Sequence, residues 1–244
     1  APWAAEAVFV SALGVVGFLM SRLARELEPE KARMLFGTAL IVFVFRATPL
    51  PGPGLTWFEI DVLGFDEGFL AVLSVLTSGL ALIGLVALRP LMARWTIAGI
   101  TALLSVIAGV LALPNIALYH GLHEWTAPRT GGVVDARFIA ILDTAAESPL
   151  GQLAMVPMLA WIARNAPAQL KATFFAVMAA FTNLALSASG LATRYVNRIW
   201  EVTRETPSTP ADYSELGTLL VAVEVVSVAA PLLTILIVQS SPLR

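Results

Sequence analysis

Seven apolar stretches, each near the length of a membrane crossing, constrain what this chain can fold into. A helix needs about 20 apolar residues to cross the hydrocarbon core of a bilayer. Of the 244 residues, 58% are hydrophobic and 13% are charged, whereas a soluble domain carries about 25% charged residues. We therefore expect an all-α polytopic membrane protein. The expected spans are 3–21, 34–50, 66–88, 92–113, 133–163, 168–192 and 215–239.

Composition and motifs exclude several classes of function. The net charge of -2, with no basic patch, argues against a nucleic-acid partner. The chain has no Cys, so it has no disulfide framework and no thiolate nucleophile. No phosphate-binding glycine loop is present, which disfavours ATP-driven transport by this chain. His120, His123 and Glu124 are best explained as solvated residues, and we expect no metal site and no cofactor.

Two carboxylates, Asp143 and Glu147, lie in the middle of the fifth apolar stretch. An ionisable group inside a membrane is costly, and it usually faces a bundle interior or a wet cavity on a substrate or proton path. The two acids are four residues apart, so a helix places both on the face that also carries Ala140. Burial and mutual repulsion favour protonation of at least one of them near neutral pH. The pattern predicts proton coupling; the alternative is that each acid bonds a neighbouring polar group and fixes helix register.

Three further polar residues lie inside apolar stretches and are candidate substrate-binding or proton-coupling residues. Arg46 can pair with Asp143 or bind a carboxylate through two hydrogen bonds, or it can extend to the membrane surface. Asn183 belongs to a stripe of small and polar residues at helical spacing, which helix packing also explains. Glu224 stands alone in the last apolar stretch and is a second-rank proton or pairing site. Arg137 does not share the face of Asp143 and is expected at the membrane interface.

The distribution of Lys and Arg predicts the orientation. The positive-inside rule assigns the side richer in Lys and Arg to the cytoplasm. We therefore expect a multi-pass protein of the cell (inner) membrane, with an external N-terminus and a cytoplasmic C-terminus. The basic residues expected on the inner side, nine of the fifteen, are Arg22, Arg25, Lys31, Arg33, Arg89, Arg94, Arg164, Lys171 and Arg244.

The odd number of spans and the external N-terminus predict that this chain is a fragment or a natural half of a larger transporter. Residues 1–33 are then the last helix of a missing N-terminal half with its basic cytoplasmic loop, and residues 34–244 are a six-helix transmembrane half. The expected partners are the lipid bilayer, a small organic anion, and the missing half or a partner chain.

Two segments of the sequence resemble a known family. FRATPLPGPGLTWFEIDVLGFDEGFLAVLSVLTSGLALIG, at residues 45–84, is similar to the seventh and eighth helices of the folate-biopterin transporter family, a branch of the major facilitator superfamily. LDTAAESPLGQLAMVPMLAWIARNAPAQLKATFFAVMAAFTNLALSASGL, at residues 142–191, resembles that family's tenth and eleventh helices. The resemblance implies two six-helix halves with the substrate held between them near the middle of the membrane.

The function that these observations favour is secondary active transport of an organic anion such as a pteridine, with proton coupling. The alternative is a non-transporting membrane scaffold or assembly subunit of a larger complex. A membrane enzyme that uses Asp143 and Glu147 as acid and base is the least favoured reading, because the other groups that such chemistry needs are not apparent.

Overall fold

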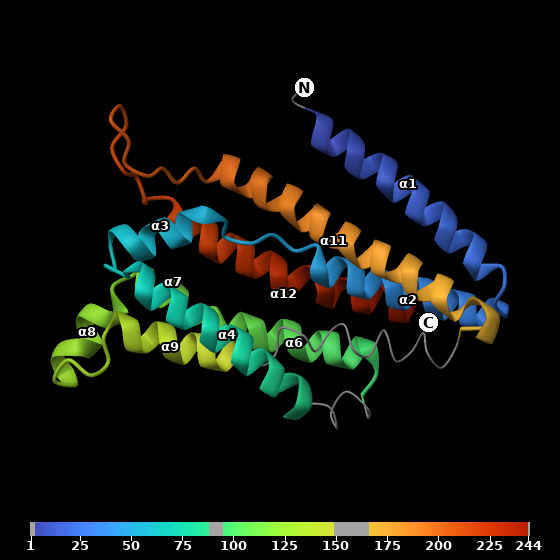
Figure 1. Ribbon diagram of the computed structural model, residues 1–244, viewed down its shortest axis with the longest axis horizontal. Helices are drawn as coiled ribbons and strands as arrows, with labels where there is room; N and C mark the ends of the chain where they lie inside the picture. The colour runs from blue at the N-terminus through green and yellow to red at the C-terminus, as the bar shows by residue number, and fades with distance from the viewer. Residues whose placement is uncertain (1–2, 88–94, 149–165, 244) are drawn as a thin grey trace.

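The computed structural model describes residues 3–87, 95–148 and 166–243 (Figure 1). The described residues form α-helices and one short 3-10 helix, and they contain no β-strand. Their bounds are α1 Ala4–Ala24, α2 Pro29–Arg46, α3 Pro53–Asp61, α4 Glu67–Ala87, α6 Ile97–Leu111, α7 Leu113–Tyr119, α8 Leu122–Arg129, α9 Ala136–Glu147, η2 Ala168–Leu170, α11 Lys171–Ile199 and α12 Leu216–Ser240.

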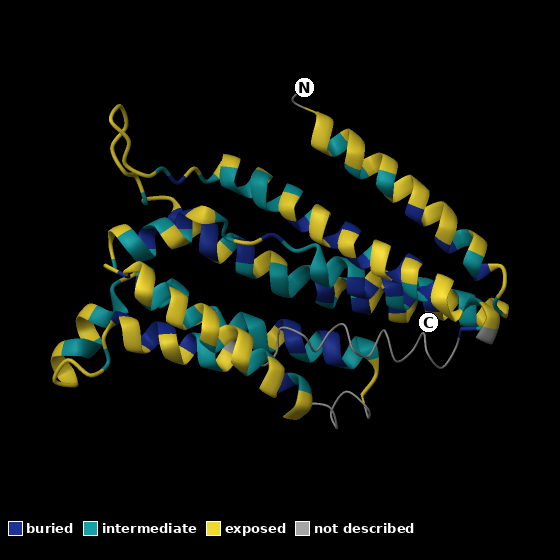
Figure 2. Ribbon diagram, in the orientation of Figure 1, coloured by how far each residue is buried: buried dark blue, intermediate teal, exposed yellow. Residues whose placement is uncertain are grey.

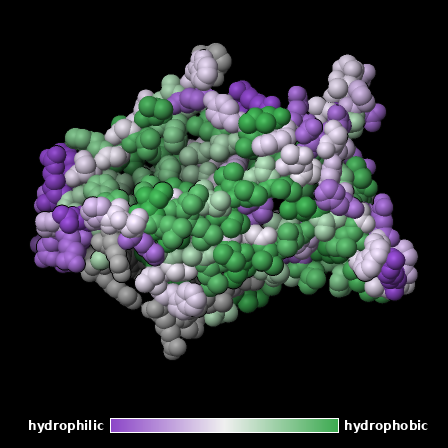
Figure 3. Space-filling view, turned by 180° about the vertical axis from the view of Figure 1, so that it is seen from behind, coloured by the Kyte–Doolittle hydropathy of each residue, from purple (hydrophilic) through white to green (hydrophobic). Residues whose placement is uncertain are grey.

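The expectation of an all-α polytopic membrane protein is confirmed. Within the described ranges, five helices are long and apolar enough to cross a membrane: α1, α4, α6 with α7, α11 and α12. Figure 3 shows the corresponding surface, an apolar band between two hydrophilic ends. Helix α2 carries several charged residues in its 18 residues and is not among the five. The second part of the fifth expected span, from residue 149 onward, lies outside the described residues.

Two of the expected spans end later in the structure than the sequence predicted. The span placed at 92–113 continues through α7 to Tyr119, because Pro114 lies in the first turn of α7, where a proline is tolerated. The span placed at 168–192 continues as α11 to Ile199. There Arg194 is paired with Glu6 of α1, which offsets the cost of a cation in the longer helix. The stretch between α2 and α4 contains the short helix α3.

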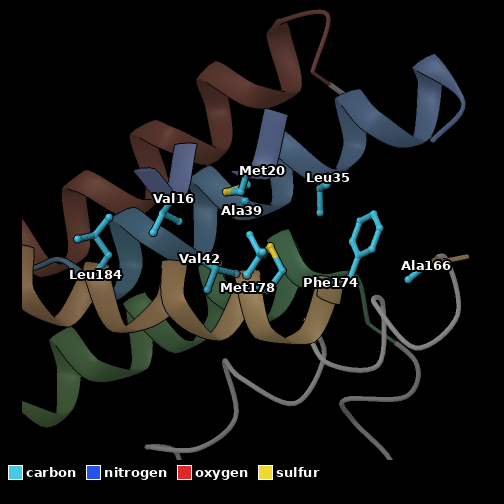
Figure 4. Close-up of a cluster of buried hydrophobic side chains, with 10 residues drawn as sticks. Val16, Met20, Leu35, Ala39, Val42, Ala166, Phe174, Met178 and Leu184 are labelled. Carbon is cyan, nitrogen blue, oxygen red and sulfur yellow. The ribbon is translucent and has the colours of Figure 1, made fainter. Parts of the chain in front are cut away.

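The main apolar core joins α1, α2 and α11. Val16 and Met20 of α1 and Val42 of α2 belong to the same buried cluster as Phe174 and Met178 of α11 (Figure 4). Helix association inside a membrane depends on close packing of this kind, because lipid is as apolar as the side chains. Buried residues lie in the middle of α2 and in α11 as far as Ser189, whereas most of α1 is exposed (Figure 2).

Helix α12 packs against α2 and α6, and small residues allow the close approach. A Cβ atom on Gly109 of α6 would lie 2.7 Å from the side chain of Val228. A Cβ atom on Gly217, at the start of α12, would lie 2.4 Å from the ring of Tyr119. The Tyr119 hydroxyl donates hydrogen bonds to the carbonyl oxygens of Tyr213 and Ser214, at 3.1 and 3.0 Å. Together these contacts fix the end of α7 against the start of α12.

Residues 47–66, which we call the connector, join α2 to α4 at one end of the bundle (Figure 1). Polar side chains from α11 hold its first part. The Ser189 hydroxyl donates to the carbonyl oxygen of Thr48 at 2.6 Å, and the amide of Leu50 donates to the Thr193 hydroxyl at 2.9 Å. Gly52, at a φ of 76°, lies directly against the side chain of Asn197. The connector is therefore fixed to α11 before α3 begins.

Candidate functional site

The candidate site is centred on Asp143 in α9. Asp135 caps this helix by accepting a hydrogen bond from the amide of Phe138 at 2.8 Å, which sets the phase of the residues that follow. Ile139, Ala140 and Asp143 then fall on one face, and all three are buried. Asp143 is only 7% exposed. The sequence prediction that Ala140 and Asp143 share a face is confirmed.

Asn115 of α7 holds the Asp143 carboxylate. Its side-chain amide donates a hydrogen bond of 2.9 Å to Oδ2 of Asp143. Asn115 directly follows Pro114, at the point where the membrane span changes from α6 to α7. A buried carboxylate needs such donors, because desolvation without compensating hydrogen bonds costs several kcal/mol or more. Sequence reasoning missed Asn115, although an amide directly after a proline inside an apolar span was an available signal.

Glu59 of α3 adds a second carboxylate to the site. It is half-buried, and its charge is coupled to that of Asp143. Burial, together with the nearby negative charge of Asp143, raises the pKa of Glu59 to about 7. Glu59 was not among the site residues predicted from the sequence. Its electrostatic coupling to Asp143 depends on the course of the connector, which no local pattern encodes.

The acid that was expected to act with Asp143 is Glu147. Its backbone ends α9, and the position of its side chain lies outside the described part of the chain. The geometry therefore brings Asp143 together with Asn115, the negative charge of Asp143 acts on Glu59, and the predicted pairing with Glu147 stays a prediction. Arg137, expected at the interface, is exposed and forms a 2.7 Å ion pair with Asp66 of the connector.

Arg46 lies at the last position of α2 and is half-buried. Within the described ranges its guanidinium forms no ion pair, and its Nε atom is buried without a hydrogen-bond acceptor. No described hydrogen bond or ion pair joins it to Asp143. A partly buried cation without a protein counter-ion is suited to an anionic ligand, because the ligand would supply the missing charge.

Asn183 lies on the exposed side of α11. The stripe to which the sequence assigned it is exposed at each of its positions, and nothing approaches within 4 Å of the Cβ position of Gly190. The hydrogen bonds of α11 to the connector come from Ser189 and Thr193 instead. These two polar residues were not identified from the sequence.

Glu224 lies at the interface between α12 and α6. Its Oε1 atom is 3.5 Å from the position that a Cβ atom on Gly109 would occupy. Glu224 is half-buried, and the small residue opposite it leaves room for the carboxylate. Its proton-coupling role stays a prediction.

The raised pKa of Glu59 has a consequence for stability. The folded protein retains the Glu59 proton up to a pKa of about 7, whereas the unfolded chain releases it near the ordinary value of 4.5. Stability from this group is therefore fully present below about pH 4.5 and is lost as the pH rises through 7. We expect the melting temperature to fall by roughly a few degrees between pH 5 and pH 8. Glu59→Gln should remove this part of the pH dependence.

The measurement is thermal unfolding of the purified protein in detergent across that pH range. The matched control is Glu205→Gln, because Glu205 is exposed and forms no ion pair within the described ranges. It should keep the wild-type pH dependence. An identical pH dependence in wild type and Glu59→Gln would contradict the assignment.

Comparisons with known proteins agree with the resemblance seen in the sequence. The sequence model of the BT1 family matches residues 6–243. A protein from Synechocystis sp., named folate-biopterin transporter, is 30% identical over 146 residues, which are 60% of this chain and 28% of that protein. The aligned region thus spans little more than a quarter of the relative. No solved structure matches the chain. The match along nearly the whole chain identifies it as a member of the BT1 family.

Proposed function

We propose that this protein is part of a secondary transporter that moves an organic anion of the pteridine class together with protons. The observation that carries the proposal is the buried Asp143 carboxylate, which Asn115 holds and which is coupled to the half-buried Glu59. Ionisable groups in such positions mark proton or substrate paths in membrane proteins. Membership of the BT1 family, and the name of the Synechocystis relative, support the choice of substrate class.

The two carboxylates supply the proton step. Burial of Glu59 and the negative charge of Asp143 disfavour ionising both carboxylates, so we expect one proton to be bound by the two groups near neutral pH. Binding that proton removes a negative charge from the site and favours the arrangement in which the site is closed to water. Release on the other side of the membrane restores the charge. Cycles of this kind couple a proton gradient to a change between two conformations.

Arg46 is proposed as the residue that binds the substrate anion. Its half-buried guanidinium has no described counter-ion, and a guanidinium can donate two parallel hydrogen bonds to a carboxylate. In this proposal residues 34–244 form one wall of the substrate path, and a second half of the transporter forms the other. Only 28% of the Synechocystis relative is aligned with this chain, which is consistent with further helices in a complete transporter.

Replacing Asp143 by Asn tests proton coupling. The substitution keeps a hydrogen-bonding group of the same size beside Asn115 but cannot release a proton. We expect pH-gradient-driven uptake of a radiolabelled pteridine or folate into membrane vesicles to lose its pH dependence. Glu67→Gln, which changes an exposed acid at the start of α4, is the control and should behave like wild type. Unchanged pH-dependent uptake by Asp143→Asn would remove the proposed role.

Replacing Arg46 by Gln tests the anion site. Loss of a charge-assisted hydrogen bond is worth about 1.5–3 kcal/mol, so we expect KM for the anionic substrate to rise by about 10 to 100-fold. Arg46→Lys keeps the charge but loses the planar guanidinium that can donate two parallel hydrogen bonds. Its KM should lie between those of wild type and Arg46→Gln. The control is Arg129→Gln, an exposed arginine stacked on Trp125. A KM unchanged in Arg46→Gln would assign Arg46 to the membrane surface instead.

The orientation is also part of the proposal: the end that carries the connector faces outward and the C-terminus faces the cytoplasm. The chain has no Cys, so single cysteines report the side on which each position lies. We expect a membrane-impermeant maleimide added to intact cells to label Ser208→Cys, and to label Glu26→Cys only after permeabilisation. The reverse pattern would invert the proposed topology.

A further inference from the structure

Phe65 lies near the end of the connector, and its side chain is only 1% exposed. Gly64 before it has a φ of 69°, a left-handed conformation that glycine adopts without strain, so the chain can turn there. The amide of Phe65 donates a hydrogen bond of 2.9 Å to the carbonyl oxygen of Glu59. Asp66 after it accepts a hydrogen bond of 2.8 Å from the amide of Phe69 and so caps α4. The backbone is therefore fixed on both sides of Phe65.

Arg137 of α9 binds both neighbours of Phe65. One of its terminal nitrogens donates a hydrogen bond of 2.7 Å to the Asp66 carboxylate and one of 3.3 Å to the carbonyl oxygen of Gly64. Its guanidinium lies 5.2 Å from the centre of the Phe69 ring, and that ring packs edge-on against Phe65 with centroids 4.8 Å apart. The connector is thus joined directly to the start of α9 at the position of Phe65.

Helices α7 and α9 run in opposite directions relative to the connector. Helix α7 ends at Tyr119, whose ring centroid lies 5.5 Å from that of Phe58 in α3, so α7 runs toward the connector. Helix α9 begins next to Arg137, which is bonded to the connector, so α9 runs away from it. Later residues of α7 and earlier residues of α9 are therefore the ones nearer to the connector.

The side chain of Phe65 lies in a buried cluster with Leu118 of α7 and Ile139 of α9. Leu118 follows Asn115 by three residues, and Ile139 precedes Asp143 by four, so each lies about one helical turn nearer to the connector. Asn115 and Asp143 are joined by the 2.9 Å hydrogen bond at the centre of the site. Phe65 and its cluster therefore cover that hydrogen bond on the connector side.

We propose that Phe65 closes the Asp143 site toward the connector. Asp143 is only 7% exposed, and the apolar ring lies between its carboxylate and the polar groups of the connector. An apolar constriction excludes water and with it the hydrogen-bonded route that a proton needs. The inference rests on the proposed function for what passes through, and in that cycle Phe65 withdraws when a proton or substrate reaches Asp143 from this side.

The test measures how fast a thiol at position 140 reacts. The chain has no Cys, and Ala140 is a 6% exposed member of the cluster that contains Phe65. A small, charged methanethiosulfonate is added on the side of the membrane from which Ser208→Cys is labelled. We expect slow labelling of Ala140→Cys. Adding Phe65→Ala should raise the rate by roughly tenfold or more, because a buried thiol reacts only when its surroundings open.

Two controls separate closure of the site from general loosening of the bundle. Val62→Ala also removes an apolar side chain from the connector, but Val62 is 55% exposed, so the Ala140→Cys rate should not change. Ala39→Cys reports the main core, where Ala39 is 1% exposed, and its rate should stay low with Phe65→Ala. An unmoved Ala140→Cys rate, or an equal rise at Ala39→Cys, would overturn the inference.

If Phe65→Ala does not fold, Phe65→Leu decides by the same criterion. Leucine keeps an apolar side chain in the cluster but fills less of the space, so the selective rise at Ala140→Cys should be smaller. Equal labelling of Ala140→Cys with Phe65 and with Leu at this position would then count against the closure.

A second measurement connects the closure to transport. In vesicles without substrate, Phe65→Ala should dissipate an imposed pH gradient faster than wild type, and adding Asp143→Asn should remove the increase. Selective labelling of Ala140→Cys without a leak that depends on Asp143 would overturn the proposed proton role of Asp143 and support the closure by Phe65. The labelling rate therefore tests the closure, and the leak tests the proposed function.

Discussion

The burial of the Asp143 carboxylate is the constraint on which the rest of the site depends. A carboxylate that is 7% exposed in an apolar protein needs donors within reach, and Asn115 supplies one. That hydrogen bond requires α7 to run beside α9, which in turn requires the membrane span to continue past Pro114. The division of this span into α6 and α7 therefore serves the site as well as the fold. Glu59 then completes the site from a segment that crosses no membrane.

Polar contacts at one end of the bundle hold the connector from two sides. Ser189 and Thr193 of α11 fix its beginning, and Asp61 fixes its helix to Arg204 in the loop between α11 and α12. Backbone groups in an irregular segment must find hydrogen-bond partners, and side chains of a neighbouring helix provide them here. Apolar packing organises the remainder of the bundle, as the cluster around Phe174 and Val42 shows. Polar contacts thus fix the connector, and apolar packing organises the long helices.

Much of the fold follows from hydropathy, and less of the site does. The apolar spans, the membrane class and the buried face of α9 were predicted because each depends on periodicity or composition within one segment, and the family was predicted from the resemblance of two segments to it. Asp143 was identified for the same reason. Glu59 and Asn115 were missed because their roles depend on tertiary contacts between segments far apart in sequence. Asn183 was chosen for the helical spacing of its stripe, and only packing shows that this stripe is exposed and that Ser189 contacts the connector instead.

The length of α11 has a mechanical consequence. Its 29 residues extend about 43 Å at about 1.5 Å per residue, whereas the hydrocarbon core is about 30 Å thick. The helix is therefore longer than a perpendicular crossing needs, and its excess length is accommodated by tilt or by extension beyond the lipid tails. The connector is bound to the C-terminal part of α11 by Ser189 and Thr193, so its position follows that of this helix. Bilayer thickness and the tilt of α11 therefore influence how far the connector lies from the lipid tails.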